Sequence, residues 1–480
     1  MPSVRALVAG TISLLMLIGS SITALGDEPV TPATPRATCL GEFDKPETGM
    51  QGRVSAEDVD SGRAAQGYTC NTQQVGHFGA RGLTGGAGGY KVHRYVDATG
   101  RECAYYDSTL LFPLDAVKAS TDLPGVIVLD MTNPAEPIKT ANLVTPAMLS
   151  PHESLSISHS RGLLAAVVGS PVFYPGIVDV YDISADCRQP VLRSSTPLGI
   201  LGHEGNFSPD GLTFWATSTG GNTVTAIDVS DPTVPSIAWT GNHNFHGLTI
   251  RDDGARMYAA DLGRRGVTIL DISQVQARVP DPVVTEIGFV TWDNVSIPQQ
   301  PMPVTIGGHP YLVEVDEFAR GTSPGNPANP VGAARIIDIV DEAHPVVVSD
   351  LRLEVHQPEN IPATAGDPGA TWMLGGYTGH YCSVPKREDP GIVACSFILS
   401  GLRVFDITDP LAPKEIAYFN VPVPPAGPTT FPGGSSSSFT PHAAYAMSAP
   451  AYAPERDEIW YTDGSFGFYN VRLTNDVWPD

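Results

Sequence analysis

The stretch "VTAIDVSDP" at residues 224–232 decides the fold of this chain. A run rich in β-branched residues ends at Asp228, and an apolar residue and a Ser-Asp-Pro segment follow. The run predicts a β-strand, and the Asp and Pro residues predict a tight turn after it. The same phrase occurs six times, with its aspartates at Asp130, Asp182, Asp228, Asp271, Asp338 and Asp406.

Each phrase belongs to a larger repeating unit. Before "VTILDIS" (267–273), for example, "HGLTIRDDGARMYAAD" (246–261) contains two apolar runs joined by a turn at Gly254. A Pro-containing turn and one more strand follow most of the phrases. Four antiparallel strands in a unit of this length are typical of a propeller blade.

The units predict an all-β fold, a seven-bladed β-propeller of four-stranded antiparallel blades. The last unit has room for only three strands, so we expect residues 68–79 to supply the fourth and close the ring. Residues 68–480 would then form a single propeller domain. The blades are predicted at 88–142, 151–196, 203–240, 245–290, 300–353, 355–421 and 440–480, with an inserted loop near 362–396.

The N-terminus has the pattern of a secretory signal peptide. Arg5 precedes an apolar run, and the small residues Ala24 and Gly26 suit the positions before a cleavage point. The alternative, an uncleaved anchor, is disfavoured because the run is short for a membrane span. We therefore predict a signal peptide at 1–26, an irregular N-terminal arm at 27–67, and no membrane span after signal removal. The mature protein would be secreted, periplasmic or part of the cell envelope.

Six cysteines in an exported chain favour disulfides. Cys382 and Cys395 flank a predicted hairpin loop and are expected to pair. For the others, the expected pairs are Cys70–Cys103 and Cys39–Cys187. No CxxC motif is present, which argues against a thiolate zinc site.

Composition limits the class of partner. The formal net charge is −23, and such a chain repels phosphate backbones, so no nucleic-acid partner is expected. The high numbers of Gly and Pro, 49 and 44, suit many short strands joined by turns. No pattern in the sequence indicates an oligomeric state.

The strand motif also resembles a known family. "GVIVLDMTNP" (125–134), "VTAIDVSDP", "VTILDIS" and "LRVFDITDP" (402–410) resemble the repeats of LVIVD-repeat proteins, which are exported or surface bacterial β-propellers. The resemblance covers most of residues 88–480. It implies a seven-bladed propeller and carries no activity, because function resides in a site and not in a fold.

The six motif aspartates are interpreted as structural. An Asp at the end of a strand can accept hydrogen bonds from the backbone of the following turn. We therefore assign none of them to catalysis.

Histidines recur at a position where chemistry is plausible. His203 and His246 lie at the same distance before the turn glycines Gly211 and Gly254, so they occupy equivalent positions in neighbouring blades. Innermost strands line the channel of a propeller and begin on one rim. The predicted rim histidines are His152, His203, His246, His356 and His442, with Glu153, Glu204 and Glu359 placed to orient the imidazoles.

Convergent neutral imidazoles can bind Fe, Cu or Zn. The structural alternative is that each His caps its strand and recurs through shared repeat ancestry. His93 and His309 are displaced from the equivalent position in their repeats, and surface or loop positions are expected for His77, His159, His243, His344 and His380.

Two functions are compatible with these features. The first is binding of a small molecule, or of an envelope protein or glycan, at the channel mouth and rim loops, with or without a histidine-bound metal. The second is a metal-dependent enzyme, either an oxidase or oxygenase or a hydrolase or lyase, with an all-His centre. The sequence identifies no other cofactor site and no specific catalytic residue.

Overall fold

The computed structural model describes residues 31–79, 88–107, 125–169, 174–423 and 443–479. The predicted signal peptide, 1–26, lies outside this part of the chain. Residues 32–480 form one compact unit. Within the described ranges, no helix is both long and apolar enough to cross a bilayer.

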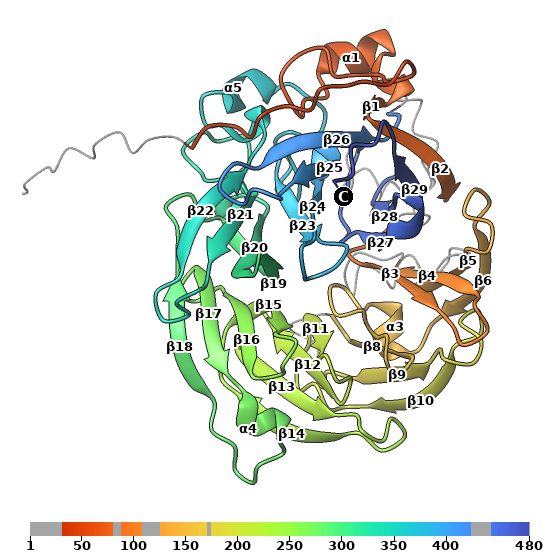
Figure 1. The fold of residues 1–480 in the computed structure, drawn as a ribbon, viewed down its shortest axis with the longest axis vertical. Coiled ribbons are helices and arrows are strands. Elements are labelled where there is room, and N and C mark those ends of the chain that lie inside the picture. Colours follow the sequence, from red (N-terminus) through yellow and green to blue (C-terminus); the bar gives the residue numbers. More distant parts are fainter. Residues whose placement is uncertain (1–30, 80–87, 108–124, 170–173, 424–442, 480) are drawn as a thin grey trace, which may run out of the picture. The chain divides into compact units, whose positions relative to one another are not determined.

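Seven antiparallel sheets stand around a common centre, as Figure 1 shows, and the prediction of a seven-bladed β-propeller is confirmed. Blade one consists of β3 (Val92–Val96), β4 (Glu102–Asp107), β5 (Val126–Asp130) and β6 (Ile138–Leu143). Blade two consists of β7 (Ser156–Ser158), β8 (Leu163–Val167), β9 (Val178–Asp182) and β10 (Val191–Thr196). Blade three consists of β11 (Glu204–Phe207), β12 (Thr213–Ser218), β13 (Thr223–Asp228) and β14 (Ser236–Gly241). Blades four and five consist of β15 (Phe245–Ile250), β16 (Arg256–Asp261), β17 (Gly266–Asp271) and β18 (Thr285–Val290); and β19 (Ile297–Ile306), β20 (His309–Glu317), β21 (Ala334–Asp338) and β22 (Val346–Leu351). Blades six and seven contain β23 (Gly379–Ser383), β24 (Ile392–Phe397), β25 (Gly401–Asp406) and β26 (Lys414–Asn420); and β27 (Ala451–Ala453), β28 (Glu458–Asp463) and β29 (Gly467–Leu473).

An N-terminal strand closes the ring, as predicted. Strand β2 (Thr72–Phe78) pairs with β29 and completes blade seven. Strand β1 (Tyr68–Cys70) instead pairs with β26 as a fifth strand of blade six. The predicted single strand therefore divides at Asn71, which has φ 52°. Asn tolerates this left-handed conformation, and its side-chain amide donates to the carbonyls of Thr38 and Ile416.

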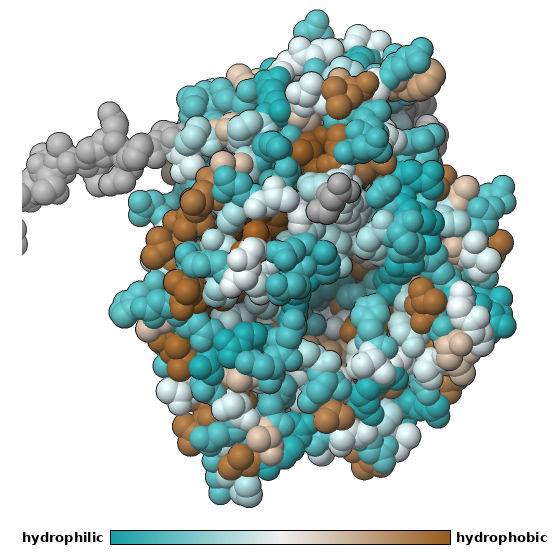
Figure 2. Space-filling model, viewed as in Figure 1, coloured by the Kyte–Doolittle hydropathy of each residue, from teal (hydrophilic) through white to brown (hydrophobic). Residues whose placement is uncertain are grey.

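The core lies between neighbouring blades. One cluster joins Leu163 and Val180 of blade two to Phe214 of blade three, and another joins Tyr258 of blade four to Leu312 of blade five. The outer surface is mixed. Figure 2 shows that hydrophilic residues prevail on the viewed face and that apolar residues form scattered groups.

The structural role of the motif aspartates is confirmed. Each accepts a hydrogen bond from the backbone N–H two residues later, at 2.8–2.9 Å. The second oxygen of each faces a basic side chain. These partners are Arg188, Arg193, Arg278, Arg256, His309 and Lys414, in chain order of the aspartates.

Asp228 provides a test of this role. Burial would raise the pKa of its carboxyl, but hydrogen bonds from Arg278 and Ser230 outweigh that effect and lower it to about 2. A carboxyl with a depressed folded pKa stabilises the fold above its unfolded pKa, near 4, and loses that contribution as the pH falls towards 2. We expect Asp228→Asn to lower the free energy of unfolding most above pH 4, with the deficit shrinking as the pH falls. Urea unfolding at pH 6, 4 and 3 checks this, and a deficit that grows in acid would contradict it.

The first strand of blade six was misplaced by the sequence analysis. Its innermost strand is β23, and the chain from Glu354 to Thr378 is an insertion. The insertion contains the 3₁₀ turn η3 (Glu354–His356) and the short helix α5 (Ile361–Thr364). Prolines at 358, 362 and 368 lack the N–H that a central strand needs, which explains the absence of a strand here.

The arm before the propeller is fixed by side-chain contacts. It contains the helix α1 (Ala56–Ser61) and the turn η1 (Ala64–Gln66) and is otherwise irregular. Arg53 forms an ion pair with Asp367 of the insertion. Glu47 accepts from the fully buried Arg403 of β25. The arm is thus tied to blade six and its insertion.

All six cysteines form disulfides, and only one of the three predicted pairs is right. Cys382–Cys395 joins β23 to β24 across directly paired positions. The other two predicted pairs are wrong, since the bonds are Cys39–Cys70 and Cys103–Cys187. Cys103 lies in blade one and Cys187 in a turn of blade two, so packing between blades decides the pairing. Three disulfides are consistent with an extracytoplasmic protein.

Candidate metal centre

Four histidines and a glutamate meet at the start of the innermost strands. His152 and Glu153 precede β7, His203 directly precedes β11, and His246 and His380 are the second residues of β15 and β23. These strands belong to blades two, three, four and six. The histidines therefore come from sequence positions far apart and converge because a propeller begins its innermost strands on one rim.

The ligand-type atoms of this cluster are close together. The Oε2 atom of Glu153 lies 3.0 Å from Nε2 of His246 and 3.2 Å from Nε2 of His203. The two Nε2 atoms are themselves 3.1 Å apart. The ring of His152 lies 4.4 Å from that of His203, and its Nε2 is 3.9 Å from Glu153 Oε1.

His380 and a second glutamate complete the cluster. Nε2 of His380 lies 3.4 Å from Glu153 Oε1 and 3.3 Å from Oε2 of Glu317, the last residue of β20. Glu317 also approaches His246, at 3.7 Å. The groups His152–Glu153–His203 and Glu153–Glu317–His380 both have the spacing needed to hold a metal ion.

Irregular backbone positions these side chains. The pairing of β15 with β16 shifts between Phe245 and Leu248, and that of β23 with β24 shifts between Gly379 and Tyr381. Such bulges re-aim a side chain, here the imidazole of His246 or His380. His152 has φ 50°, a conformation that non-glycine residues adopt uncommonly.

Backbone carbonyls fix the tautomers of two histidines. Nδ1 of His246 lies 2.9 Å from the carbonyl oxygen of Pro298, and Nδ1 of His380 lies 2.5 Å from that of Met447. A carbonyl only accepts, so each Nδ1 carries the proton and each Nε2 faces the carboxylates. This arrangement is typical of metal-ligating histidines.

The cluster is buried and strongly polarised. Glu153, His246 and His380 are at most 2% exposed. Burial opposes the charged form of each imidazole, but the carboxylates of Glu153 and Glu317 outweigh it and raise the pKa of His246 to about 10 and that of His380 to about 9. Burial likewise disfavours ionised Glu153, yet His152 and His246 hold the pKa of its carboxyl well below the usual range. Without a bound cation, the cluster therefore carries imidazolium–carboxylate pairs.

A second polar layer lies next to the cluster. The carboxylate of Glu204, one residue after His203, accepts from the Lys91 ammonium at 2.9 Å and from Gln300 at 3.1 Å. Gly247 makes room for it, since a Cβ there would lie 2.3 Å from Glu204 Oε2. The hydrogen-bond partners of the Glu204 carboxylate are therefore Lys91 and Gln300. Among the described residues, no hydrogen bond joins this carboxylate to an imidazole.

Aromatic rings line another side of the cluster. The ring of Tyr90 lies 4.2 Å from that of His152 and 5.2 Å from that of His380. Phe318 approaches His380 at 5.4 Å, and Tyr445 packs in the same apolar group. Apolar walls lower the local dielectric and strengthen electrostatic interactions in the site.

The structure brings together three of the five predicted histidines, His152, His203 and His246. His356 lies in the insertion instead, where its Nδ1 accepts from the backbone of Leu353 and its ring packs on Phe397. Glu359 is exposed and, like His356, lies in the insertion and not in the cluster. His442 lies outside the described residues.

His380 and Glu317 were missed. His380 was predicted to be a surface or loop residue, but it is fully buried in the cluster. The available signal was the hairpin at Cys382–Cys395, because the first strand of that hairpin is the innermost strand of blade six. Glu317 is the last residue of β20 in blade five, and no repeated phrase in the sequence identifies it.

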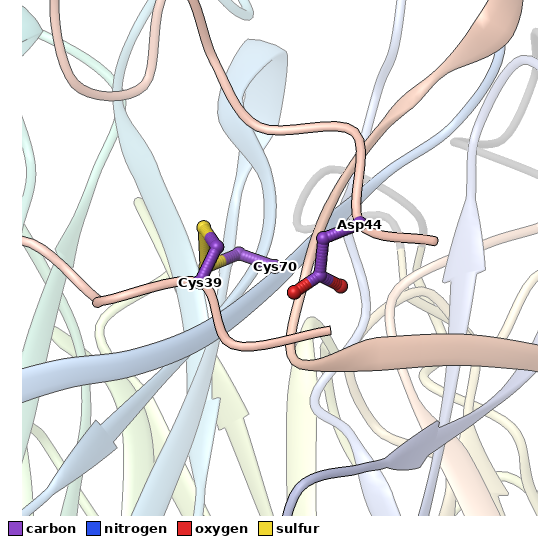
Figure 3. Close-up of side chains that lie close together, drawn as sticks. All are labelled: Cys39, Asp44 and Cys70. Atoms are coloured by element: carbon purple, nitrogen blue, oxygen red, sulfur yellow. A yellow bond between two sulfur atoms is a disulfide. The ribbon is translucent and has the colours of Figure 1, made fainter. Parts of the chain in front are cut away.

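A third group of potential metal ligands, in the N-terminal arm and β1, is not a metal site. Cys39, Asp44 and Cys70 lie close together, but Figure 3 shows the two sulfur atoms bonded to each other with the Asp44 carboxylate beside them. That carboxylate accepts from the backbone N–H groups of Gly41 and Asn71. This group is a disulfide with a capped turn and offers no thiolate.

Comparison with known proteins identifies neither a family nor an activity for the chain. No family model and no curated protein sequence matches the chain, so membership of the LVIVD-repeat proteins stays a prediction. Among solved structures, the chain is similar to the periplasmic gluconolactonase of Pseudomonas aeruginosa (TM-score 0.46, 13% identity, 74% of this chain and 94% of that chain). It is also similar to hydrazine synthase of Kuenenia stuttgartiensis (0.47, 12%, 81% and 97%) and to the β-propeller domain of Myceliophteria thermophila Cps50 (0.46, 10%, 84% and 100%). At these identities no activity transfers to the chain.

Proposed function

We propose that the protein is an exported β-propeller that binds one transition-metal ion in its channel. The ligands would be Nε2 of His152, His203, His246 and His380 together with the carboxylate of Glu153. The carrying observation is the mutual spacing of 3.0–3.2 Å among Glu153 Oε2, His203 Nε2 and His246 Nε2. Ligands about 2.0–2.1 Å from one ion and at right angles to each other are separated by about 3 Å.

The chemistry of the donors supports a transition metal. Nitrogen donors outnumber carboxylates, which favours Fe, Cu or Zn over Mg or Ca. Nε2 of His380 is buried and has no hydrogen-bond partner among the described residues, although it lies 3.3 Å from Glu317 and 3.4 Å from Glu153. A divalent cation would also compensate the buried negative charge of Glu153, which the protonated imidazoles otherwise balance.

The protein residues would hold and shield the ion. The carbonyls of Pro298 and Met447 orient two imidazoles, and Tyr90 and Phe318 exclude water. A bound ion of this kind supplies Lewis-acid polarisation of a ligand or activation of O₂ or water. The site thus suits binding of a small molecule at the metal, and, as an alternative, metal-dependent oxidase or oxygenase or hydrolase or lyase chemistry.

Titration with Co²⁺ tests the proposal, because this ion reports its ligands through visible absorption. We expect absorption bands that saturate at one equivalent and disappear when Zn²⁺ is added. A matched control is His309→Ala/His344→Ala. It removes two histidines that are more exposed than those of the cluster, and it should leave the titration unchanged. Absence of saturable bands in the folded wild-type protein would overturn the proposal.

A further inference from the structure

The channel contains a cavity beside the polar layer of Lys91, Glu204 and Gln300. Its volume is about 620 Å³. Side chains of all seven innermost strands line it, among them Ser156, Asn206, Thr249 and Gln300. A cavity of this size and position is typical of a small-molecule site.

The charge of the lining is the opposite of the charge of the protein. Lys91, Arg94, Lys386 and Arg387 line the cavity, and none of the described residues of the lining is Asp or Glu. The chain as a whole carries a formal net charge of −23. A random sample of this acidic surface would present carboxylates, so four cations around one cavity are unexpected.

The carboxylates that pair with these cations lie outside the lining. Arg94 contacts Glu102 and Glu455, and Lys91 contacts Glu204. Arg387 likewise pairs with Asp252, so three of the four cations have carboxylate partners that are not part of the lining. Lys91 is only 4% exposed, and an ammonium has three N–H donors, of which Glu204 accepts one.

Neutral groups complete a site with two kinds of surface. The hydroxyl of Thr249, a residue 3% exposed, has no hydrogen-bond partner within the described part of the chain. Tyr95 and Tyr452 contribute rings, and Leu155 and Met302 contribute aliphatic side chains. A ligand here would meet cationic and hydroxyl donors together with apolar walls.

We propose that this cavity binds a small organic anion, with its carboxylate or phosphate group at Lys91 and its apolar body against the rings. The inference rests on the lining alone and does not require the metal proposed above. Lys386, which lies in the turn between β23 and β24, would strengthen the binding of the anion. Because Lys91 also contacts Glu204, the anionic group would lie next to the layer that adjoins the His/Glu cluster.

Three probes with one ring system test the charge preference. 2-Naphthoate, 1-naphthyl phosphate and the neutral 2-naphthamide are titrated into the folded protein and followed by calorimetry. We expect at least one anion to bind about tenfold or more tightly than the amide, because a hydrogen bond to a charged group is stronger than one between neutral groups. The tighter anion identifies the preferred head group. Equal binding of all three, or no binding at millimolar concentration, would overturn the proposal.

Two variants locate the binding in the cavity. Lys91→Met with Glu204→Gln removes the buried pair without leaving a lone charge and should abolish the preference for the anion. Lys386→Gln should weaken anion binding about threefold, as an exposed pair does. Lys414→Gln, the same change on β26 outside the cavity, should have no effect, and an equal loss there would contradict the site. The same titration of a His246→Ala/His380→Ala variant separates the two proposals, because anion binding there should persist.

Discussion

The double substitution His246→Ala/His380→Ala is expected to lower metal affinity by more than about a hundredfold, since changes in residues that merely support metal ligands already cost about 10–100-fold. Both side chains place Nε2 next to Glu153, and both are fixed by backbone carbonyls. The loss would be measured by competition with a chromophoric chelator for Zn²⁺. Retention of wild-type affinity would contradict the assignment.

A second variant protects this test from failure to fold. Removing both imidazoles leaves Glu153 and Glu317 buried without their partners, which is destabilising. Glu153→Gln keeps the shape of the side chain and removes one charge, so it should weaken metal binding while circular dichroism stays unchanged. His356→Ala is the negative control and should leave the metal affinity unchanged. The sequence predicts this residue as a ligand, but the structure places it in the insertion.

Removal of the Cys103–Cys187 disulfide is expected to have the largest effect on stability. The bond spans 84 residues and joins blades one and two. Loop-closure entropy predicts a loss of about 4–5 kcal/mol for Cys103→Ala/Cys187→Ala. Urea unfolding followed by tryptophan fluorescence would measure this loss.

Cys382→Ala/Cys395→Ala is the comparison, because that bond closes a hairpin with a sequence separation of 13. Its expected loss is about 3 kcal/mol. A smaller effect for the long-range bond than for the hairpin bond would contradict the view that the long-range bond stabilises the ring between blades.

The repeat in the sequence predicts the fold because each blade carries the same local instructions. The motif aspartates could be assigned correctly since their hydrogen bonds reach only two residues along the chain. The same local logic fails at blade six. Its insertion contains a His and starts where a strand was expected, so His356 was selected in place of His380.

The rest of the candidate site depends on three-dimensional relations. Glu317 enters from the end of a second strand, and no repeated pattern marks it. Cys39–Cys70 and Cys103–Cys187 depend on how the arm and adjacent blades pack, which spacing along the chain does not encode. Sequence therefore predicts the elements and their order, while contacts between blades decide the composition of the cluster.

The cluster has one competing interpretation, a metal-free network of imidazolium–carboxylate pairs. The raised pKa values of His246, to about 10, and His380, to about 9, make such a network stable at neutral pH in the absence of a cation. The two interpretations differ in the number and type of atoms around an added ion. An adventitious ion on the surface would be held mainly by carboxylates and water.

X-ray absorption spectroscopy of the protein loaded with one equivalent of Zn²⁺ tests the central claim most directly. The metal centre predicts nitrogen and oxygen neighbours at about 2.0–2.2 Å with the outer-shell scattering of at least three imidazoles, and no sulfur neighbour. All six cysteines are in disulfides, so they offer no thiolate to the ion. A spectrum with one imidazole or none would contradict the account.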